Sequence, residues 1–568
     1  MKRINSIILL CIAAFFAACN SDFLEKTPQG ELTIPQLETV DGVEGALVGA
    51  YGLLNGNVNG TWGNYSSAPS QWLFGEVGAD NAHKGSVNGD QPNMNQVELY
   101  DVSVTNDNTE IMWNRYYEGI ARCNNTLRLL KAVQAGDGTK FSDARAVEIE
   151  AEARMLRAHY YFYLVRTFKN IPYVDETIAT ADAITIPNTE PVWPKIEDDL
   201  KFAVQSLTPA KPKNEVGRVD KIAAQAYLGK VYLYQKKYGE ALVLFKDVMT
   251  AKGNLVDMPF ENNFDVTKEN GPESIFEVQH NINPDGSGDN ANVGDMLGGF
   301  YGSAPVNCCG FYQPTFDLVN SFRVTAQGLP MLDNSYRTNP YKSDFGLTGN
   351  AKTNYQLDKT IAFDPRLDYT VGRRGVPYRD WGIMAGDAWI RDPAYAGPFV
   401  GVKHMVEEAQ FSGQTVSGGR YITGLNVHLI RLADVYLMAA ECEVEAGTLG
   451  EAMRLVNAVR ARAAKLPGKV VDGGPAAAYN VGQYAAFPSP EYARNAIHFE
   501  RRLELAMEGH RFYDLVRWGV AKQVLESYSA FEGSILSAFK DLVFDAKDEY
   551  FPIPQQQIDR SQGALTQN

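Results

Sequence analysis

Apolar residues recur at helical spacing along two parts of the chain, residues 41–252 and 424–568. Spacing of this kind is typical of amphipathic helices that bury one face. Over 253–423, and again over 55–108, Gly, Asn, Asp and Pro separate short runs that allow few long helices. The pattern predicts a mostly α fold, in which N-terminal and C-terminal helical repeats carry large loop-rich insertions with short strands and helices of their own.

The segment from Lys221 to Met249 carries a helix-pair signature. Leu228-Gly229-Lys230-Val231-Tyr232 followed by Ala241-Leu242-Val243-Leu244-Phe245 matches the L-G-x-x-Y and A-x-x-x-F pattern of a tetratricopeptide repeat. The glycine lets two helices approach closely, and aromatic side chains fill the remaining gap. We therefore expect a tetratricopeptide-like superhelix of helix pairs. Further helices are expected at 41–54 and 109–131, and further pairs at 151–168 with 193–207, 428–446 with 450–463, and 495–509 with the segment ending near Tyr528.

Composition and charge narrow the range of partners. Hydrophobic residues make up 45% and charged residues 21% of the 568 residues, which is ordinary for a globular protein. The formal net charge is -15 and no concentrated basic run is visible, so neither nucleic acid nor an anionic membrane surface is expected as the main partner. Motifs of serine hydrolases, zincins, P-loop proteins and Rossmann nucleotide sites are absent from the sequence.

The first residues are typical of an export signal. Lys2-Arg3 precedes an apolar run, Ile4–Phe16, that is too short to span a bilayer, and small residues lead to Cys19. This order predicts a lipoprotein signal peptide over 1–18 and cleavage before Cys19, whose thiol would be acylated. A plain secreted protein with an incidental cysteine is the alternative. Residues 19–40 would then be an acylated tether that holds the protein at a membrane.

Cysteines and metal ligands suggest no further site. Cys308 and Cys309 are adjacent and could form a vicinal disulfide, but the sequence has no framework of spaced cysteine pairs and no C-x-x-C spacing. The Asp-containing run 285–289 departs from a calcium loop at the turn glycine and at the final glutamate. We expect no metal ion and no cofactor.

A charged stretch near the C-terminus, residues 498–519, allows two interpretations. Glu500, Glu504 and Glu508 share one helical face at i, i+4 and i+8, beside an apolar row. Carboxylates held in this way could form an acid/base site. They could also belong to a buried lattice of ion pairs that fastens one helix to others.

Five separated segments, the acylated N-terminus among them, resemble the SusD/RagB family of outer-membrane lipoproteins. The similarity covers essentially the whole mature chain in order. The other four segments are Arg154-x-x-Arg157-Ala158-x-Tyr160-Tyr161, Arg431-Leu432-Ala433-Asp434-Val435-Tyr436-Leu437, Glu500-Arg501-Arg502-x-Glu504-Leu505 running to Arg517-Trp518, and the ending Phe551-Pro552-Ile553-Pro554 with Leu565-Thr566-Gln567-Asn568.

The resemblance implies a binding protein and not an enzyme. Members of this family sit on the extracellular face of the cell outer membrane and cover a partner TonB-dependent transporter of the SusC type. Their helical repeats mainly face the transporter, while irregular insertions, here 253–423 and 55–108, form the ligand surface. The resemblance also places the 498–519 stretch in the scaffold, where Glu500, Glu504, Arg501 and Arg511 are expected to satisfy one another and nearby helix ends.

Three patches of the loop-rich blocks are expected to form the ligand surface jointly. Sugar binding needs flat aromatic faces beside planar polar groups, and these patches combine both. Taken alone, each such aromatic is more often a packing residue than a ligand platform. The candidate ligand-binding residues are Trp72, Asn81 and His83 in the first patch, Tyr301, Phe311 and Tyr312 in the second, and Tyr378, Arg379, Asp380, Trp381 and Trp389 in the third.

Three functions are open at this point. The first is a surface lipoprotein that binds oligosaccharides or polysaccharides and delivers them to the transporter. The second keeps the fold but binds a peptide or another nutrient. The third is a glycoside hydrolase on the same anchor, because two suitably placed carboxylates are all that such an enzyme needs and sequence spacing does not reveal them.

Overall fold

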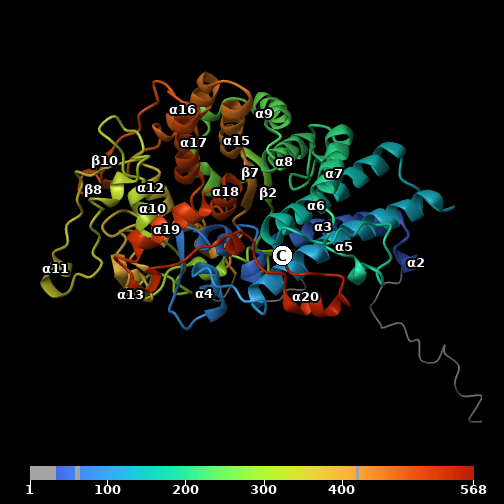
Figure 1. The fold of residues 1–568 in the computed structure, drawn as a ribbon, viewed down its shortest axis with the longest axis horizontal. Helices are drawn as coiled ribbons and strands as arrows, with labels where there is room; N and C mark the ends of the chain where they lie inside the picture. Colours follow the sequence, from blue (N-terminus) through green and yellow to red (C-terminus); the bar gives the residue numbers. More distant parts are fainter. Residues whose placement is uncertain (1–33, 58–63, 289, 417–420) are drawn as a thin grey trace, which may run out of the picture.

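Helices dominate the computed structural model, which describes residues 34–57, 64–288, 290–416 and 421–568 (Figure 1). The mostly α prediction is confirmed. The predicted signal peptide, Cys19 and most of the tether lie outside the described residues. Within the described residues, no helix combines the length and apolarity needed to cross a bilayer. The N-terminal helices are α2 (Ile34–Leu37), α3 (Val40–Gly52), α4 (Pro92–Glu98), α5 (Asp107–Ala135), α6 (Asp143–Phe168), α7 (Trp193–Ser206), α8 (Lys221–Tyr234) and α9 (Tyr238–Lys252).

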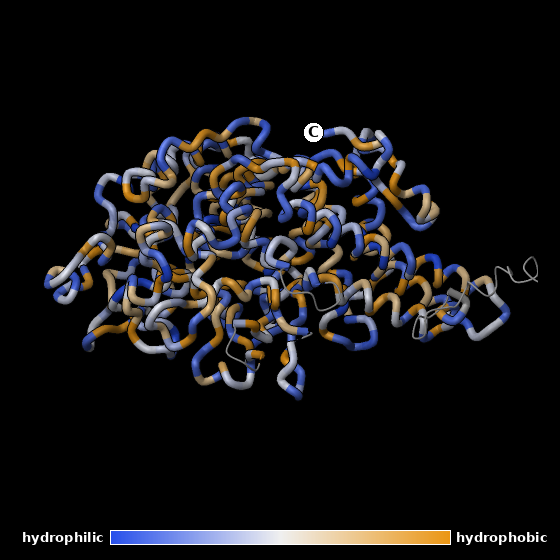
Figure 2. The backbone as a smooth tube through the Cα atoms, turned by 90° about the horizontal axis from the view of Figure 1, so that it is seen from below, coloured by the Kyte–Doolittle hydropathy of each residue, from blue (hydrophilic) through white to orange (hydrophobic). Residues whose placement is uncertain are grey.

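Successive long helices pack side by side into a continuous array. α5 packs against α6, α6 against α7, α7 against α8, and α8 against α9. α9 then packs against α15 (Leu432–Ala446), although the whole 253–423 segment separates them in sequence. The tetratricopeptide-like superhelix is therefore confirmed. Figures 1 and 2 show an elongated molecule, with α3 and α5–α7 towards its narrower end.

The C-terminal helices extend this array. α16 pairs with α15 as expected, although residues 427–431 form a strand where the sequence suggested the start of a helix. The expected pairing of 495–509 with the following segment was wrong, because α17 packs chiefly against α15 and α16. α17 ends at Leu505, and Gly509 adopts a φ of 80° before α18 begins. These helices are α16 (Leu449–Ala463), α17 (Pro490–Leu505), α18 (Arg511–Trp518), α19 (Ala521–Glu532) and α20 (Gln555–Arg560).

Short two-stranded sheets join the loop-rich segments to the array. β2 (Ser274–Val278) pairs antiparallel with β7 (Val427–Arg431), which closes the base of the insertion directly before α15. The other pairs are β1 (Ala82–Gly85) with β3 (Phe311–Pro314), β4 (Ala362–Phe363) with β10 (Ala478–Tyr479), β5 (Val371–Gly372) with β6 (Val400–Gly401), and β8 (Val470–Val471) with β9 (Gly474–Pro475). The short helices of the insertion are α10 (Phe316–Ser321), α11 (Gly349–Thr353), α12 (Leu367–Thr370), α13 (Pro393–Ala396) and α14 (Glu408–Gln414).

Two main hydrophobic clusters support these elements. The larger one runs through the helical array and includes α5–α9, α15 and α16. The second lies within the insertion, around the ring of Phe300. The insertion therefore has a core of its own in addition to its attachment to the repeats.

Glu504, near the C-terminal end of α17, lies at the centre of a buried network of ion pairs. Its Oε1 lies 2.6 Å from Arg431 Nη1 and also accepts a hydrogen bond from Arg462, and its Oε2 lies 2.9 Å from Arg366 Nη1. All four side chains are at most 1% exposed. Burial alone would raise the pKa of Glu504, but the charges of Arg462, Arg431 and Arg366 hold it well below its usual value. The arrangement agrees with the scaffold interpretation of the 498–519 stretch.

Glu500, Glu504, Arg501 and Arg511 do not pair with one another as expected, although Arg501 pairs with Asp514 of the same stretch at 3.0 Å. Arg501 lies 2.8 Å from Asp434 of α15, and Arg511 lies 2.7 Å from Asp80, which precedes β1. Glu500 bonds an arginine of α16 at 2.6 Å. The expected pairing among these four residues is wrong, because each of them bonds a charged side chain from another segment. The stretch consequently connects α17 and α18 to α15, α16 and the β1 segment.

The close approach of α8 and α9 provides a test of the repeat geometry. A Cβ added at Gly229 would lie 2.6 Å from Phe245 Cε1, so Gly229→Ala should lower the free energy of unfolding by about 1–3 kcal/mol. Gly45→Ala on the exposed side of α3 is the matched control, because an added Cβ there has no atom within 4 Å outside the helix's own nearby backbone. It should raise stability by up to ~1 kcal/mol. Urea unfolding of both variants measures this, and equal stability would contradict the packing described.

Candidate functional site

The pairing of β1 with β3 brings the three predicted patches together. His83 stands opposite Gln313, and Gly85 opposite Phe311, so the first and second patches are neighbours. The backbone N–H of Tyr301 donates to the carbonyl of Trp389 at 3.0 Å, which joins the second patch to the third. The three patches therefore lie next to one another, and their joint role in ligand binding stays a prediction.

Most of the predicted ligand-binding side chains are nevertheless buried. The aromatic rings lie in loop-rich segments of the sequence, but they are not exposed, because the insertion folds around them. The side chains that are at most 7% exposed are Trp72, Asn81, His83, Phe311, Tyr312, Tyr378, Trp381 and Trp389. In this conformation they do not present a face to a ligand, and their expected role as exposed platforms is corrected accordingly.

The third patch forms the core of the insertion. The ring of Phe300 makes edge-to-face contacts with Tyr378, Trp381 and Trp389 at centroid distances of 4.9, 5.7 and 5.0 Å. The indole N–H of Trp381 donates to the carbonyl of Val406 at 2.9 Å. These rings pack against one another, and the indole nitrogen of Trp381 is hydrogen-bonded to the backbone. These aromatic side chains therefore stabilise the insertion.

The first and second patches are similarly occupied by packing. The ring of Trp72 lies 5.5 Å from that of Tyr312, and its indole N–H donates to the carbonyl of Gly294 at 3.1 Å. Asn81 donates to Glu76 at 2.8 Å and accepts from Arg502 at 2.9 Å. These contacts fix the β1 segment to the scaffold.

His83 lies between two buried carboxylates. Its Nδ1 is 2.9 Å from Glu98 Oε1, and its Nε2 is 2.9 Å from Glu532 Oε1. Burial alone would lower the pKa of His83, but the hydrogen bonds and charges of Glu532 and Glu98 outweigh it and raise the pKa to about 9. His83 is therefore protonated at neutral pH and joins β1 to α4 and α19.

Three predicted residues are at least partly accessible. Arg379 is half-buried and pairs with Glu407 at 2.9 Å, while the carboxylate of exposed Asp380 accepts from the backbone of α14. Both are thus engaged in holding α14. Tyr301 is half-buried and lies at the edge where the three patches meet.

Residues that the sequence did not predict as ligand-binding lie next to Tyr301 and are also accessible. The Arg391 guanidinium lies 4.8 Å from the centroid of the Tyr301 ring, and its Nη1 lies 2.6 Å from Ser86 Oγ and 2.5 Å from Asp90 Oδ2. A cation over an aromatic face is an attractive contact that orients both groups. Arg391 comes two residues after the predicted Trp389, and its position next to that tryptophan is the sequence signal that indicates it.

Lys84 shapes the loop that carries Asp90. Its ammonium group donates to the carbonyls of Val87 and Asp90 at 2.9 and 2.7 Å and lies 5.1 Å from the centroid of the Tyr395 ring. Burial lowers the pKa of Lys84 to about 8. We call residues 84–90, 301–309 and 388–395 together the loop surface. Half-buried Cys308 and Cys309, joined by a disulfide, belong to it.

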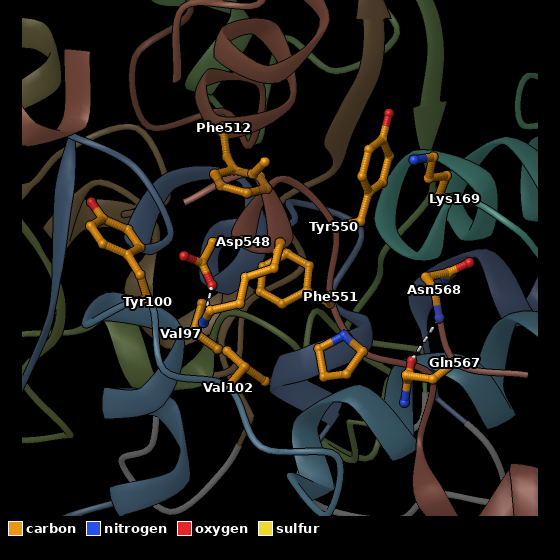
Figure 3. A pocket seen from close by; sticks show the side chains of 13 residues that line it. Val97, Tyr100, Val102, Lys169, Phe512, Asp548, Tyr550, Phe551, Gln567 and Asn568 are labelled. Atoms are coloured by element: carbon orange, nitrogen blue, oxygen red, sulfur yellow. Dashed lines mark hydrogen bonds and ion pairs between the residues drawn. The ribbon is translucent and has the colours of Figure 1, made fainter. Parts of the chain in front are cut away.

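A separate cavity of about 260 Å³ lies where the C-terminal tail packs beside α4 (Figure 3). Its walls include Tyr100, Phe512 and Phe551, and the ammonium of Lys169 lies 5.3 Å from the Tyr550 ring centroid. These aromatic residues attach the tail to the scaffold. In the described parts of the chain, no group of three or more His, Cys, Asp or Glu side chains is arranged to hold a metal ion.

The loop surface is our candidate ligand site, because it combines the half-buried ring of Tyr301 with the charges of Arg391 and Asp90.

Known proteins resemble this chain along nearly its whole length. A family model described as the SusD family matches residues 272–568, more than half of the chain, and a model described as starch-binding associating with outer membrane matches residues 22–233. SusD-like protein P25 of Formosa agariphila is 24% identical over 544 residues, which cover 92% of each chain.

Solved structures share the fold. A laminarin-binding SusD-like protein is 25% identical, with a TM-score of 0.65 over 93% of this chain and 98% of its own. Surface glycan-binding protein A from Bacteroides thetaiotaomicron, in complex with laminarihexaose, is 21% identical, with a TM-score of 0.63 over 93% of this chain and 99% of its own.

The position of His83 predicts a pH-dependent stability. Because its folded pKa of about 9 lies above the ordinary value of 6.5, its charge stabilises the native state fully below pH 6.5, and this contribution is lost as the pH rises through 9. The difference in unfolding free energy between wild type and His83→Gln should therefore be largest at about pH 6.5 and shrink towards pH 9.

Urea unfolding across this range measures the effect. His280→Gln is the control, because buried His280 has a pKa lowered to about 4 by desolvation and stays neutral throughout. Its difference from wild type should not change between about pH 7 and 9. A pH-independent difference for His83→Gln would contradict a charged His83.

Proposed function

The chain belongs to the SusD family, and from this premise we propose that it is a cell-surface lipoprotein that captures oligosaccharides and delivers them to a SusC-like TonB-dependent transporter. The descriptions of two relatives support a glycan ligand, since one binds laminarin and another was solved with laminarihexaose. The particular glycan and linkage bound by this chain are to be found by screening.

The loop surface is the observation that carries this proposal. Three segments that are distant in sequence converge there, and Arg391 holds the half-buried ring of Tyr301 in place. An aromatic ring beside charged groups is a combination that recognises a sugar, whose ring has an apolar face and a polar edge. Half-buried Arg391 and Asp90 supply the charged groups, while the buried hydroxyl of Ser86 holds Arg391 in place.

The signal-like N-terminus and the family support our proposal of a lipid anchor and a transporter partner. Acylation at Cys19 would hold the chain on the extracellular face of the outer membrane, with the helical repeats towards the transporter and the 253–423 insertion towards the ligand. This arrangement would let a bound oligosaccharide pass directly from the loop surface into the transporter.

We propose binding without hydrolysis. A glycosidase needs a carboxylic acid with a raised pKa opposite a second carboxylate, both reaching the substrate. Glu504 has the opposite character, because arginines surround it and hold its pKa well below the usual value. The sequence feature that first suggested acid/base chemistry is therefore a buried structural element.

Replacing Tyr301 tests the loop surface. Tyr301→Ala should weaken the affinity for the glycan selected in a polysaccharide screen by about tenfold, because a lost aromatic contact costs ~1 kcal/mol or more. Its melting temperature should stay near that of the wild type. The matched control is Tyr232→Ala, another half-buried tyrosine with a cation over its ring, Lys237 at 5.5 Å, in α8.

Calorimetric titration of purified protein lacking residues 1–18 measures both affinities. Equal affinities in the two variants would remove the loop surface as the binding site. Release of reducing ends from the bound glycan over time would show a hydrolase, and selective binding of peptides would show a different nutrient.

A further inference from the structure

A second cavity of about 270 Å³ lies on the outer side of the 498–519 stretch, between α17, α18, α19 and the turn Ser335–Arg337. Arg337, Arg502 and Arg511 line it together with Asp80. We call it the arginine pocket. Neither the proposed glycan surface nor the buried network around Glu504 accounts for it.

The charges of the arginine pocket do not cancel. Asp80 lies 2.7 Å from Arg511 and 3.2 Å from Arg502, and Asp317 lies 2.6 Å from Arg337 and 2.9 Å from Arg502. Three guanidinium groups thus pair with two carboxylates, so the group carries a net charge of one positive unit. This excess occurs in a chain whose net charge is -15.

Two of these guanidinium groups have donors to spare. Arg337 uses its Nε for Asp317 and its Nη1 for Ser527, while Arg511 uses its Nε and Nη2 for Asp80. Among the described residues, none accepts a hydrogen bond from Arg337 Nη2 or Arg511 Nη1. Neither nitrogen is among the buried atoms that lack a partner; Arg337 is half-buried and Arg511 is 9% exposed. Guanidinium N–H groups pair well with carboxylate and phosphate oxygens, and a sulfate ester presents oxygens in the same tetrahedral arrangement as a phosphate.

The rim of the pocket can recognise hydroxyl groups. Asn495 on α17 and Gln523 on α19 are exposed, and their side-chain amides can both donate and accept hydrogen bonds. His498 adds no charge, because burial lowers its pKa to about 3, and its ring stacks on Trp518 at 3.6 Å. The cavity lies just below the ~300 Å³ at which pockets begin to hold drug-sized ligands, so it fits one small molecule or one unit of a chain.

We propose that the arginine pocket binds a small polyhydroxylated anion, namely a sugar unit that carries a carboxylate or a sulfate ester. The oxyanion lies against Arg337 and Arg511, and the hydroxyl groups contact the amides of Asn495 and Gln523. This site is separate from the loop surface.

Calorimetric titration with D-glucuronate and with glucose 6-sulfate tests the proposal, with D-glucose as the neutral match. At least one of the two anions should bind, while glucose should show no saturable binding. The double variant Asn495→Asp and Gln523→Glu places two negative charges on the exposed rim without touching the buried arginines. It should weaken the binding of the anion about tenfold or more.

The control is Asn350→Asp with Asn354→Asp, which adds the same charge at exposed positions in and next to α11, far from the arginine pocket (Figure 1). It should leave the dissociation constant of the anion unchanged, and so should Tyr301→Ala. The proposal is overturned if neither anion binds, if glucose binds as well as the anions, or if the rim and control variants weaken binding equally. Loss of anion binding in Tyr301→Ala would place the anion on the loop surface and overturn the arginine pocket alone.

Discussion

The sharing of one buried carboxylate, Glu504, by three arginines is the interaction on which the rest of this structure depends. Arg431 ends the strand that precedes α15, Arg462 belongs to α16, and Arg366 belongs to the insertion. Each of these charges has lost its water, so each needs its partner in place. The network therefore fixes the insertion against α17, and the β2–β7 pairing and the Arg502–Asp317 ion pair attach the insertion to the array as well. The loops of the insertion take their positions from these attachments.

The scaffold and the proposed ligand surface consist of different residues. The insertion has its own aromatic core around Phe300. Ion pairs of His83 with Glu98 and Glu532 hold β1 against α4 and α19. These buried groups position the loop surface, where only the outermost residues, such as Tyr301 and Arg391, are placed to meet a ligand. Loop residues can consequently change with the ligand while the charges beneath them keep the same arrangement.

The sequence predicted the helical array well because repeat packing is local. The Leu228–Phe245 pattern indicated two helices in contact, and Gly229 against Phe245 is that contact. Long-range ion pairs could not be predicted from the sequence, because nothing near Glu504 in the sequence indicates Arg366 as its partner, 138 residues away. The tryptophans were misjudged for a related reason. Residues flanking Trp381 look like a loop, but its burial depends on Phe300 and the segment after Val400, which only folding brings near.

The stability of Glu504→Gln tests most directly whether the 498–519 stretch is scaffold. Removing this charge leaves one buried positive charge of the network without its counter-charge, although each arginine keeps another carboxylate partner. The free energy of unfolding should therefore fall by about 3–5 kcal/mol. Glu451→Gln, which breaks the exposed Glu451–Arg454 pair, should cost less than about 1 kcal/mol. Urea unfolding of both variants, followed by glycan titration of the folded fraction, measures the two effects. A Glu504→Gln variant with wild-type stability and no glycan binding would contradict this account.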